Sequence, residues 1–121
     1  MEFIFFLISK LESTSTLLFP CLLQEISRRN HEEQENIPIH IFISENAIYS
    51  LIDPPKYLID CWIEKNCHLY INQSHWTALL SAYGNMISHS MPPTSRFIDT
   101  HEFDSCFCQL LYNPEVRVFK I

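Results

Sequence analysis

The sequence predicts an α/β fold, and three patterns support this class. Residues 3–8 form an unbroken apolar run with the length of a strand that is buried on both faces. Residues 37–43 alternate between isoleucine and other side chains, which is the two-residue period of a strand. Amphipathic helical spacing occurs over residues 17–30 and 54–66. Strands that alternate with helices along the chain are typical of α/β domains.

The first helix is predicted over residues 17–30. An apolar stripe with four-residue spacing, with Cys21 beside it, is expected to face the core and consists of Leu18, Leu22 and Ile26. A proline in this helix is tolerated only in the first turn, where its missing N–H would be unpaired in any case. The helix is therefore expected to begin near Phe19.

The second helix is predicted to follow a brief strand over residues 48–52. Asp53 is expected to cap this helix, because its carboxylate can accept hydrogen bonds from the free N–H groups of the first turn. The two prolines that follow Asp53 lose no hydrogen bond there. Tyr57, Cys61 and Trp62 share the side of the helix that is expected to be buried.

The last third of the chain has weaker patterns and is predicted to be irregular. Residues 76–86 have the spacing of a short helix, and residues 116–121 are predicted to form a terminal strand. Residues 103–112 are apolar but have no clear period.

Composition indicates a folded domain and excludes several functions. Apolar residues make up 47% and charged residues 18% of the 121 residues, as in folded globular domains. The single glycine, Gly84, excludes glycine-rich loops that cradle phosphate. A net charge of −6 argues against general nucleic-acid binding, which needs a basic face. The apolar runs are too short for an export signal or a membrane span, so we expect an intracellular protein that does not bind membranes.

Cysteine and histidine side chains form two groups that are candidates for metal or thiol chemistry. In chain order, the groups are Cys61, Cys67, His68 and His75, and then His101, Cys106 and Cys108. The first group lacks the usual spacing of structural zinc ligands, and the second lacks a fourth ligand. An odd total of five cysteines fits reduced thiols better than a disulfide framework. No GxSxG nucleophile motif occurs either. We therefore predict no metal, no cofactor and no enzymatic activity.

Residues 51–62, with the sequence LIDPPKYLIDCW, resemble the end of a BRCT domain. Tyr57 stands where that family usually has tryptophan, and Cys61 stands where a cysteine is common. The resemblance implies a three-layer sandwich over residues 1–70, with a small parallel sheet and helices on both faces. It requires residues 3–8, 37–43 and 48–52 to pair as parallel strands. Residues 71–121 would be an extension that packs on this domain or a linker to a second unit.

The BRCT resemblance also implies a function. Domains of that family are protein-interaction modules of DNA repair and checkpoint signalling, so a scaffold in the nucleus that binds a protein partner, phosphorylated or not, is expected. Many of them hold phosphoserine with a Ser or Thr after the first strand and a Lys that opens the last helix. Ser9 and Lys56 lie at the corresponding positions and are the candidate phosphopeptide site, while Tyr57, Cys61 and Trp62 form the core signature.

Two other functions stay open. The chain would fit a small viral or mobile-element accessory protein that binds and masks a host partner, with a different topology and a dimer through an exposed sheet edge. It would also fit a thiol enzyme or metal protein that uses Cys106 or Cys108.

Overall fold

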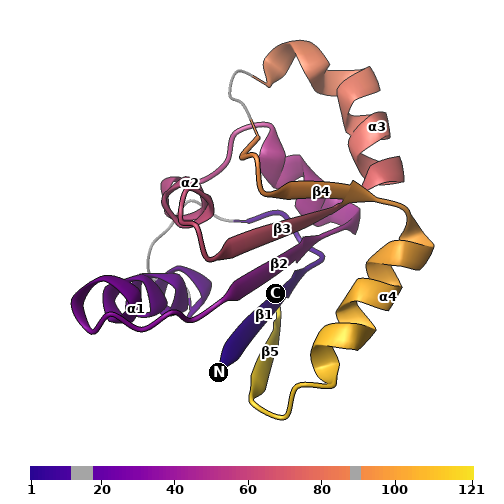
Figure 1. The fold of residues 1–121 in the computed structure, drawn as a ribbon. Helices are drawn as coiled ribbons and strands as arrows, with labels where there is room; N and C mark the ends of the chain where they lie inside the picture. The colour runs from indigo at the N-terminus through magenta and orange to yellow at the C-terminus, as the bar shows by residue number, and fades with distance from the viewer. Residues whose placement is uncertain (12–17, 88–90) are drawn as a thin grey trace.

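Strands at the centre of the molecule form one parallel sheet in the computed structural model, which describes residues 1–11, 18–87 and 91–121. Within this described part the strands are β1 (Glu2–Leu7), β2 (Ile39–Ile43), β3 (Cys67–Asn72), β4 (Ser95–Ile98) and β5 (Val116–Lys120). Their order across the sheet is β4-β3-β2-β1-β5, and all four pairings are parallel (Figure 1). The prediction of an α/β fold with a small parallel sheet is confirmed.

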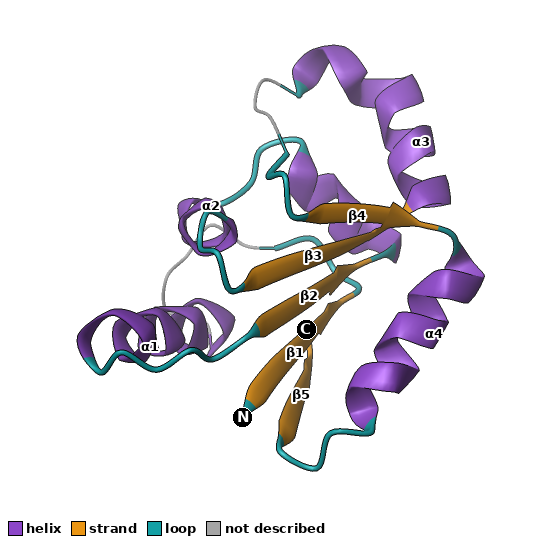
Figure 2. Cartoon of the chain, viewed as in Figure 1, coloured by secondary structure: helices purple, strands orange, loops and turns teal. Residues whose placement is uncertain are grey.

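The helices lie where right-handed crossovers place them. Three connections move one strand at a time in the same direction across the sheet, so their helices cover the same face. These helices are α1 (Leu18–Glu32), the 3-10 helix η1 (Glu45–Leu51) with α2 (Lys56–Trp62), and α3 (Gln73–Tyr83), which ends in the 3-10 turn η2 (Gly84–Met86). The last connection returns from β4 across the sheet to β5, so α4 (Thr100–Leu111) covers the opposite face. Figure 2 shows α1 and α2 on one side of the strands and α4 on the other.

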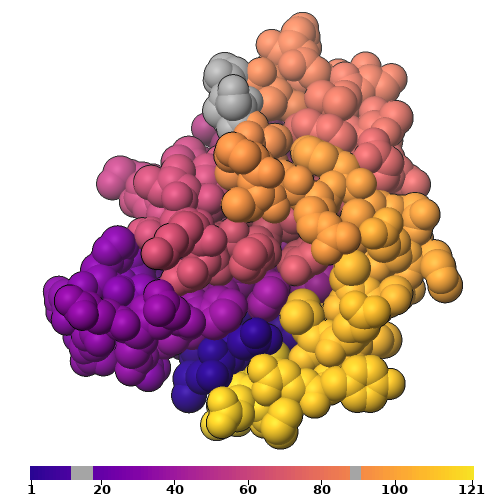
Figure 3. All heavy atoms as spheres, in the orientation of Figure 1, coloured from indigo at the N-terminus to yellow at the C-terminus, as the bar shows by residue number. Residues whose placement is uncertain are grey.

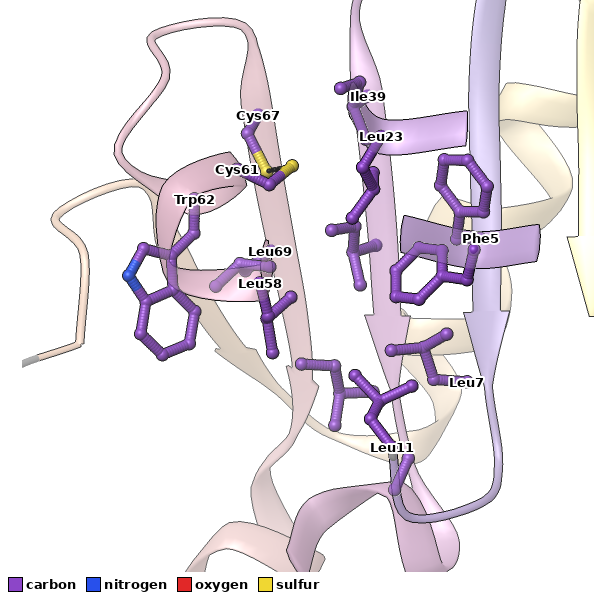
Figure 4. Close-up of a cluster of buried hydrophobic side chains, with 14 of the residues drawn as sticks. Phe5, Leu7, Leu11, Leu23, Ile39, Leu58, Cys61, Trp62, Cys67 and Leu69 are labelled. Atoms are coloured by element: carbon purple, nitrogen blue, oxygen red, sulfur yellow. Dashed lines mark hydrogen bonds between the residues drawn. The ribbon is translucent and has the colours of Figure 1, made fainter. Parts of the chain in front are cut away.

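Side-chain alternation along the strands divides the core into two clusters. The larger cluster faces α1, α2, η1 and α3, and includes Phe5, Leu7 and Leu69, each fully buried (Figure 4). The smaller cluster faces α4 and consists of Ile4, Phe42, Tyr70, Ile98 and Phe103. β1 is therefore buried on both faces, which explains its unbroken apolar run. In the view of Figure 3 only a small part of this indigo strand reaches the surface.

The prediction of a strand at residues 48–52 is wrong, because these residues belong to η1 and its C-terminal cap. Ile48 and Leu51 are both buried, and residues three apart lie on the same side of a 3-10 helix. The apolar residues therefore follow a period of three. The third parallel strand beside β2 is β3, in which His68, Tyr70 and Asn72 interrupt the apolar pattern.

Both predicted helices form, with different details. In α1 the buried residues include Phe19, Leu23 and Ile26, and Leu22 packs partly buried against the same core. The predicted stripe is therefore correct at Ile26 and in part at Leu22, but it is wrong at Leu18, which is 62% exposed, and at Cys21, which is exposed. Helix α2 begins after Pro55, whose extended backbone forms the cap without a side-chain hydrogen bond. A residue that precedes proline avoids the helical region. Asp53 therefore lies too early to cap α2.

The prediction of an irregular C-terminal third is wrong as well. Residues 73–120 contain α3, η2, β4, α4 and β5, and the two strands belong to the same sheet as β1. The predicted short helix and terminal strand correspond to α3 and β5. Helix α4 is well capped: the Asp99 carboxylate accepts a hydrogen bond from the Glu102 backbone N–H at 2.7 Å.

Candidate functional site

A groove lies between η1 and α3, where two neighbouring strands end. β2 leads through Ser44 into η1, and β3 leads directly into α3. Carboxyl ends of parallel strands are the usual place for ligands in α/β domains. The groove has a volume of about 290 Å³ and is lined by Glu45, Asn46, Ile48, Tyr49, His75, Ala78, Leu79, Ala82 and Tyr83.

The long walls of this groove, which we call the η1/α3 groove, are apolar and aromatic. Tyr49 and Tyr83 are 41% and 38% exposed, and their ring centroids lie 6.1 Å apart in an edge-to-face arrangement. Ala78 and Ala82, one helical turn apart on α3, carry small side chains that leave room between the walls. Aromatic rings that stay exposed beside small side chains can bury more area against a partner.

Polar groups gather where the groove meets the strands. The Asn72 side chain accepts a hydrogen bond from the His75 backbone N–H at 3.2 Å and so caps α3. The Nδ1 atom of His75 in turn accepts the Glu45 backbone N–H at 2.9 Å. In the neutral ring the proton therefore lies on Nε2. The Glu45 side chain is exposed and has no ion-pair partner among the described residues.

The Glu45 backbone is strained. Its φ of 52° lies in the left-handed region, which only Gln34 shares among the described non-glycine residues. This conformation costs about 1–2 kcal/mol for a residue with a Cβ atom. The hydrogen bond to His75 helps to hold it. Strained backbone is common at ligand sites, so this feature supports a role for the groove.

A second groove lies between α1 and α2, but its charges are already paired. It has a volume of about 370 Å³. Arg28 on its wall pairs with Glu25 at 2.7 Å and with Glu32 at 3.3 Å, and His31 lies 2.8 Å from Glu64. Side chains that compensate one another locally leave little net charge for a ligand.

Another polar set lies on the α4 face of the sheet. His40 is 7% exposed, and its Nδ1 atom lies 3.1 Å from the Tyr70 hydroxyl. Burial and neighbouring His68 lower the pKa of His40, although Glu2 partly opposes them. Burial raises the pKa of Tyr70. Both shifts favour the neutral forms, so this pair is suited to a structural role and not to proton transfer near neutral pH.

The predicted phosphopeptide residues are not brought together by any described contact. Ser9 follows β1 and is exposed. Lys56 opens α2 with a side chain that is 90% exposed and pairs with Asp60 at 3.4 Å. The residues of the core signature have a different environment: Tyr57, Cys61 and Trp62 are all buried against the sheet.

The two cysteine–histidine groups are divided by the fold. Cys61 and Cys67 face each other in the core, with sulfur atoms 3.6 Å apart, while His75 lies in the η1/α3 groove. On α4, Cys106 is half-buried and Cys108 is exposed. Within the described part of the chain, no three His, Cys, Asp or Glu side chains are placed to hold a metal ion.

Sequence reasoning did not single out Glu45, Tyr49 or Tyr83. Assigning residues 48–52 to a strand hid the three-residue period that turns Tyr49 outward while Ile48 and Leu51 face the core. The three-residue period of buried positions in η1 was the signal that could have placed Tyr49 on the surface.

No family model matches the sequence, and no curated protein matches it at a significant level. Among solved structures, the chain is similar to the ychN protein from E. coli. The two align with a TM-score of 0.50 and 12% sequence identity over 100% of both chains. At this identity the likeness shows the fold alone. No helix in the described ranges is both long and apolar enough to cross a membrane.

Proposed function

We propose that this chain is a non-catalytic module that binds a segment of a partner protein in the η1/α3 groove. The exposed pair of Tyr49 and Tyr83, together with the exposed alanines of α3 that line the same groove, carries this proposal. A partner side chain placed between the rings would remove apolar surface of both proteins from water, which is the main driving force for such association.

The charges of the groove favour a basic partner segment. Glu45 is the one carboxylate among the described lining residues, and none of them is lysine or arginine. The chain as a whole carries a net charge of −6. A segment with an apolar or aromatic anchor next to Lys or Arg would match both the walls and the carboxylate.

The size and rim of the groove favour a side chain over a free small molecule. Small-molecule pockets usually have volumes of roughly 300–1,000 Å³ and enclose most of the ligand. This groove, at about 290 Å³, lies at the lower end of that range, and Tyr49 and Tyr83 at its rim are more than a third exposed. Its histidine has one ring nitrogen occupied by the backbone of Glu45, which leaves it poorly placed as a general base.

A peptide selection tests this function. Random 12-residue peptides displayed on phage would be selected for binding to the full chain. The affinity of the enriched peptides would then be measured for the wild-type chain and for Ala82→Arg, in which the arginine side chain fills the groove. A matched control is Ser81→Arg, because Ser81 is the exposed neighbour on the same helix but does not line the groove. We expect enriched peptides to contain an apolar anchor beside Lys or Arg.

The variants are expected to differ in their affinity for the selected peptides. Ala82→Arg should weaken binding by about tenfold or more, equivalent to about 1.4 kcal/mol, and Ser81→Arg by less than about twofold. Glu45→Gln should weaken binding by about threefold to tenfold through the lost charge pair. Peptides that bind wild type and Ala82→Arg equally well, or that carry acidic residues, would contradict the proposal.

The role in DNA repair or checkpoint signalling in the nucleus depends on the BRCT resemblance and stays a prediction. The most specific part of this prediction is that Ser9 and Lys56 bind a phosphate group. A phosphoserine peptide should then bind more tightly than the same unmodified peptide, and Lys56→Ala should remove the difference. Equal affinity of both peptides for the wild-type chain would end that idea.

A further inference from the structure

Two cysteines far from the η1/α3 groove form a contact that the proposed function does not use. Cys61 lies in the last turn of α2, and Cys67 is the first residue of β3. Their sulfur atoms are 3.6 Å apart. Figure 4 shows the two sulfurs pointing at each other, while the neighbouring Trp62 ring points away. The five-residue connection between them therefore turns the two thiols toward each other.

The two thiols differ in their access to solvent. Cys67 is fully buried, whereas Cys61 is 7% exposed and lines the groove between α1 and α2. Cys61 is therefore the member of the pair that lies nearer to solvent. The remaining cysteines lie on other elements, with Cys21 on α1 and Cys106 and Cys108 on α4.

We propose that Cys61 and Cys67 are a modification site that forms a reversible intramolecular disulfide with a low-molecular-weight disulfide, such as oxidised glutathione, as the oxidant. A disulfide needs a sulfur–sulfur distance of about 2.05 Å, so the sulfurs must approach by only about 1.5 Å from their present 3.6 Å. The product would join the end of α2 to the start of β3.

The reaction balances in two exchange steps. Cys61 loses its proton, and its thiolate attacks one sulfur of oxidised glutathione, which forms a mixed disulfide and releases one glutathione thiolate. Cys67 then loses its proton, and its thiolate attacks the Cys61 sulfur and releases the second glutathione thiolate. Two electrons pass from the protein to the small disulfide, and the two protons protonate the two released thiolates.

The reaction is slow at neutral pH. The hydrogen bond with Cys67, together with burial, raises the pKa of the Cys61 thiol, so only a small fraction is thiolate. The rate should therefore rise by about tenfold per pH unit below that pKa.

The test uses a variant in which Cys61 and Cys67 are the cysteines that remain. The full-length variant Cys21→Ser/Cys106→Ser/Cys108→Ser would be incubated folded with excess oxidised glutathione at pH 8, and its intact mass measured. We expect a product lighter by two hydrogen atoms, with no glutathione attached, that iodoacetamide no longer modifies and that dithiothreitol restores. Adding Cys67→Ser should stop the reaction at one glutathione adduct on Cys61.

Two results would overturn this proposal. One is a stable glutathione adduct on the variant that retains both Cys61 and Cys67, and the other is two thiols that stay open to alkylation after oxidation. If the triple variant does not fold, peptide mapping of the oxidised wild-type chain decides the question. A linked pair of peptides containing Cys61 and Cys67 supports the proposal, and disulfides of any other composition alone contradict it.

Discussion

The two faces of the sheet are packed by different means. The face under α1, α2, η1 and α3 is filled by aliphatic and aromatic side chains such as Phe5, Ile41 and Leu69. The face under α4 mixes apolar residues with the buried pair of His40 and Tyr70. Topology is the cause, because three crossovers cover one face and a single return helix covers the other. The first face should therefore depend on packed volume, and the second on polar pairing and pH.

The largest expected effect is on the apolar face. Trp62 is 4% exposed, so Trp62→Ala should lower the free energy of unfolding by about 3–5 kcal/mol through lost burial and a new cavity. The neighbouring Ile63 is 73% exposed, and Ile63→Ala should change it by less than about 0.5 kcal/mol. Urea denaturation of both variants measures the difference. A loss below about 1 kcal/mol for Trp62→Ala would contradict this view of the face.

The α4 face should respond to lost hydrogen bonding. Nε2 of His40 already lacks a hydrogen-bond partner among the described residues, and Tyr70→Phe would remove the partner of Nδ1 as well. This variant should lose about 1–3 kcal/mol of unfolding free energy. The double variant His40→Leu/Tyr70→Phe removes both polar groups and should recover most of the loss. A double variant that is less stable than Tyr70→Phe would refute this explanation.

The same histidine should make stability depend on pH. Burial and His68 lower the pKa of His40 below its ordinary value of 6.5. Unfolding therefore takes up a proton as the pH falls below about 6.5, and stability is lost from there down to the folded-state pKa. For one group the slope cannot exceed about 1.4 kcal/mol per pH unit. Urea denaturation between pH 7.5 and pH 5.5 should show a smaller loss for His40→Leu than for wild type, and parallel profiles would contradict the assignment.

The smallest expected effect on stability comes from a change at Glu45 in η1, which covers the apolar face of the sheet. Glu45→Gly should raise the unfolding free energy by about 0.5–1 kcal/mol, because glycine adopts a positive φ without strain. Gln34→Gly is the matched control, since Gln34 has a similar φ of 55° outside the η1/α3 groove. Both changes should stabilise the chain in thermal denaturation, but only Glu45→Gly should weaken binding of the selected peptides. Weakened binding by both variants would argue against a local role of Glu45.

The sequence predicted the strands whose apolar residues form a clear pattern over the whole strand. β1 is apolar on both faces, and β2 carries isoleucine at every second position, so both strands are recognisable from their apolar residues. β3 also lies inside the sheet, but it was missed because three of its six residues, His68, Tyr70 and Asn72, carry polar groups that break the apolar run. The site was missed for a related reason: Glu45 and Tyr49 belong to a 3-10 helix whose period of three resembles neither a strand nor an α-helix over so few residues.

The most direct test of the η1/α3 groove is to map where a selected peptide binds. Amide chemical shifts of the uniformly ¹⁵N-labelled chain would be followed while the peptide is added. We expect the largest changes in residues 45–49 and 75–83, and no change in the groove between α1 and α2. Changes concentrated around Leu23, Arg28 and Asp60, with η1 and α3 unperturbed, would contradict it.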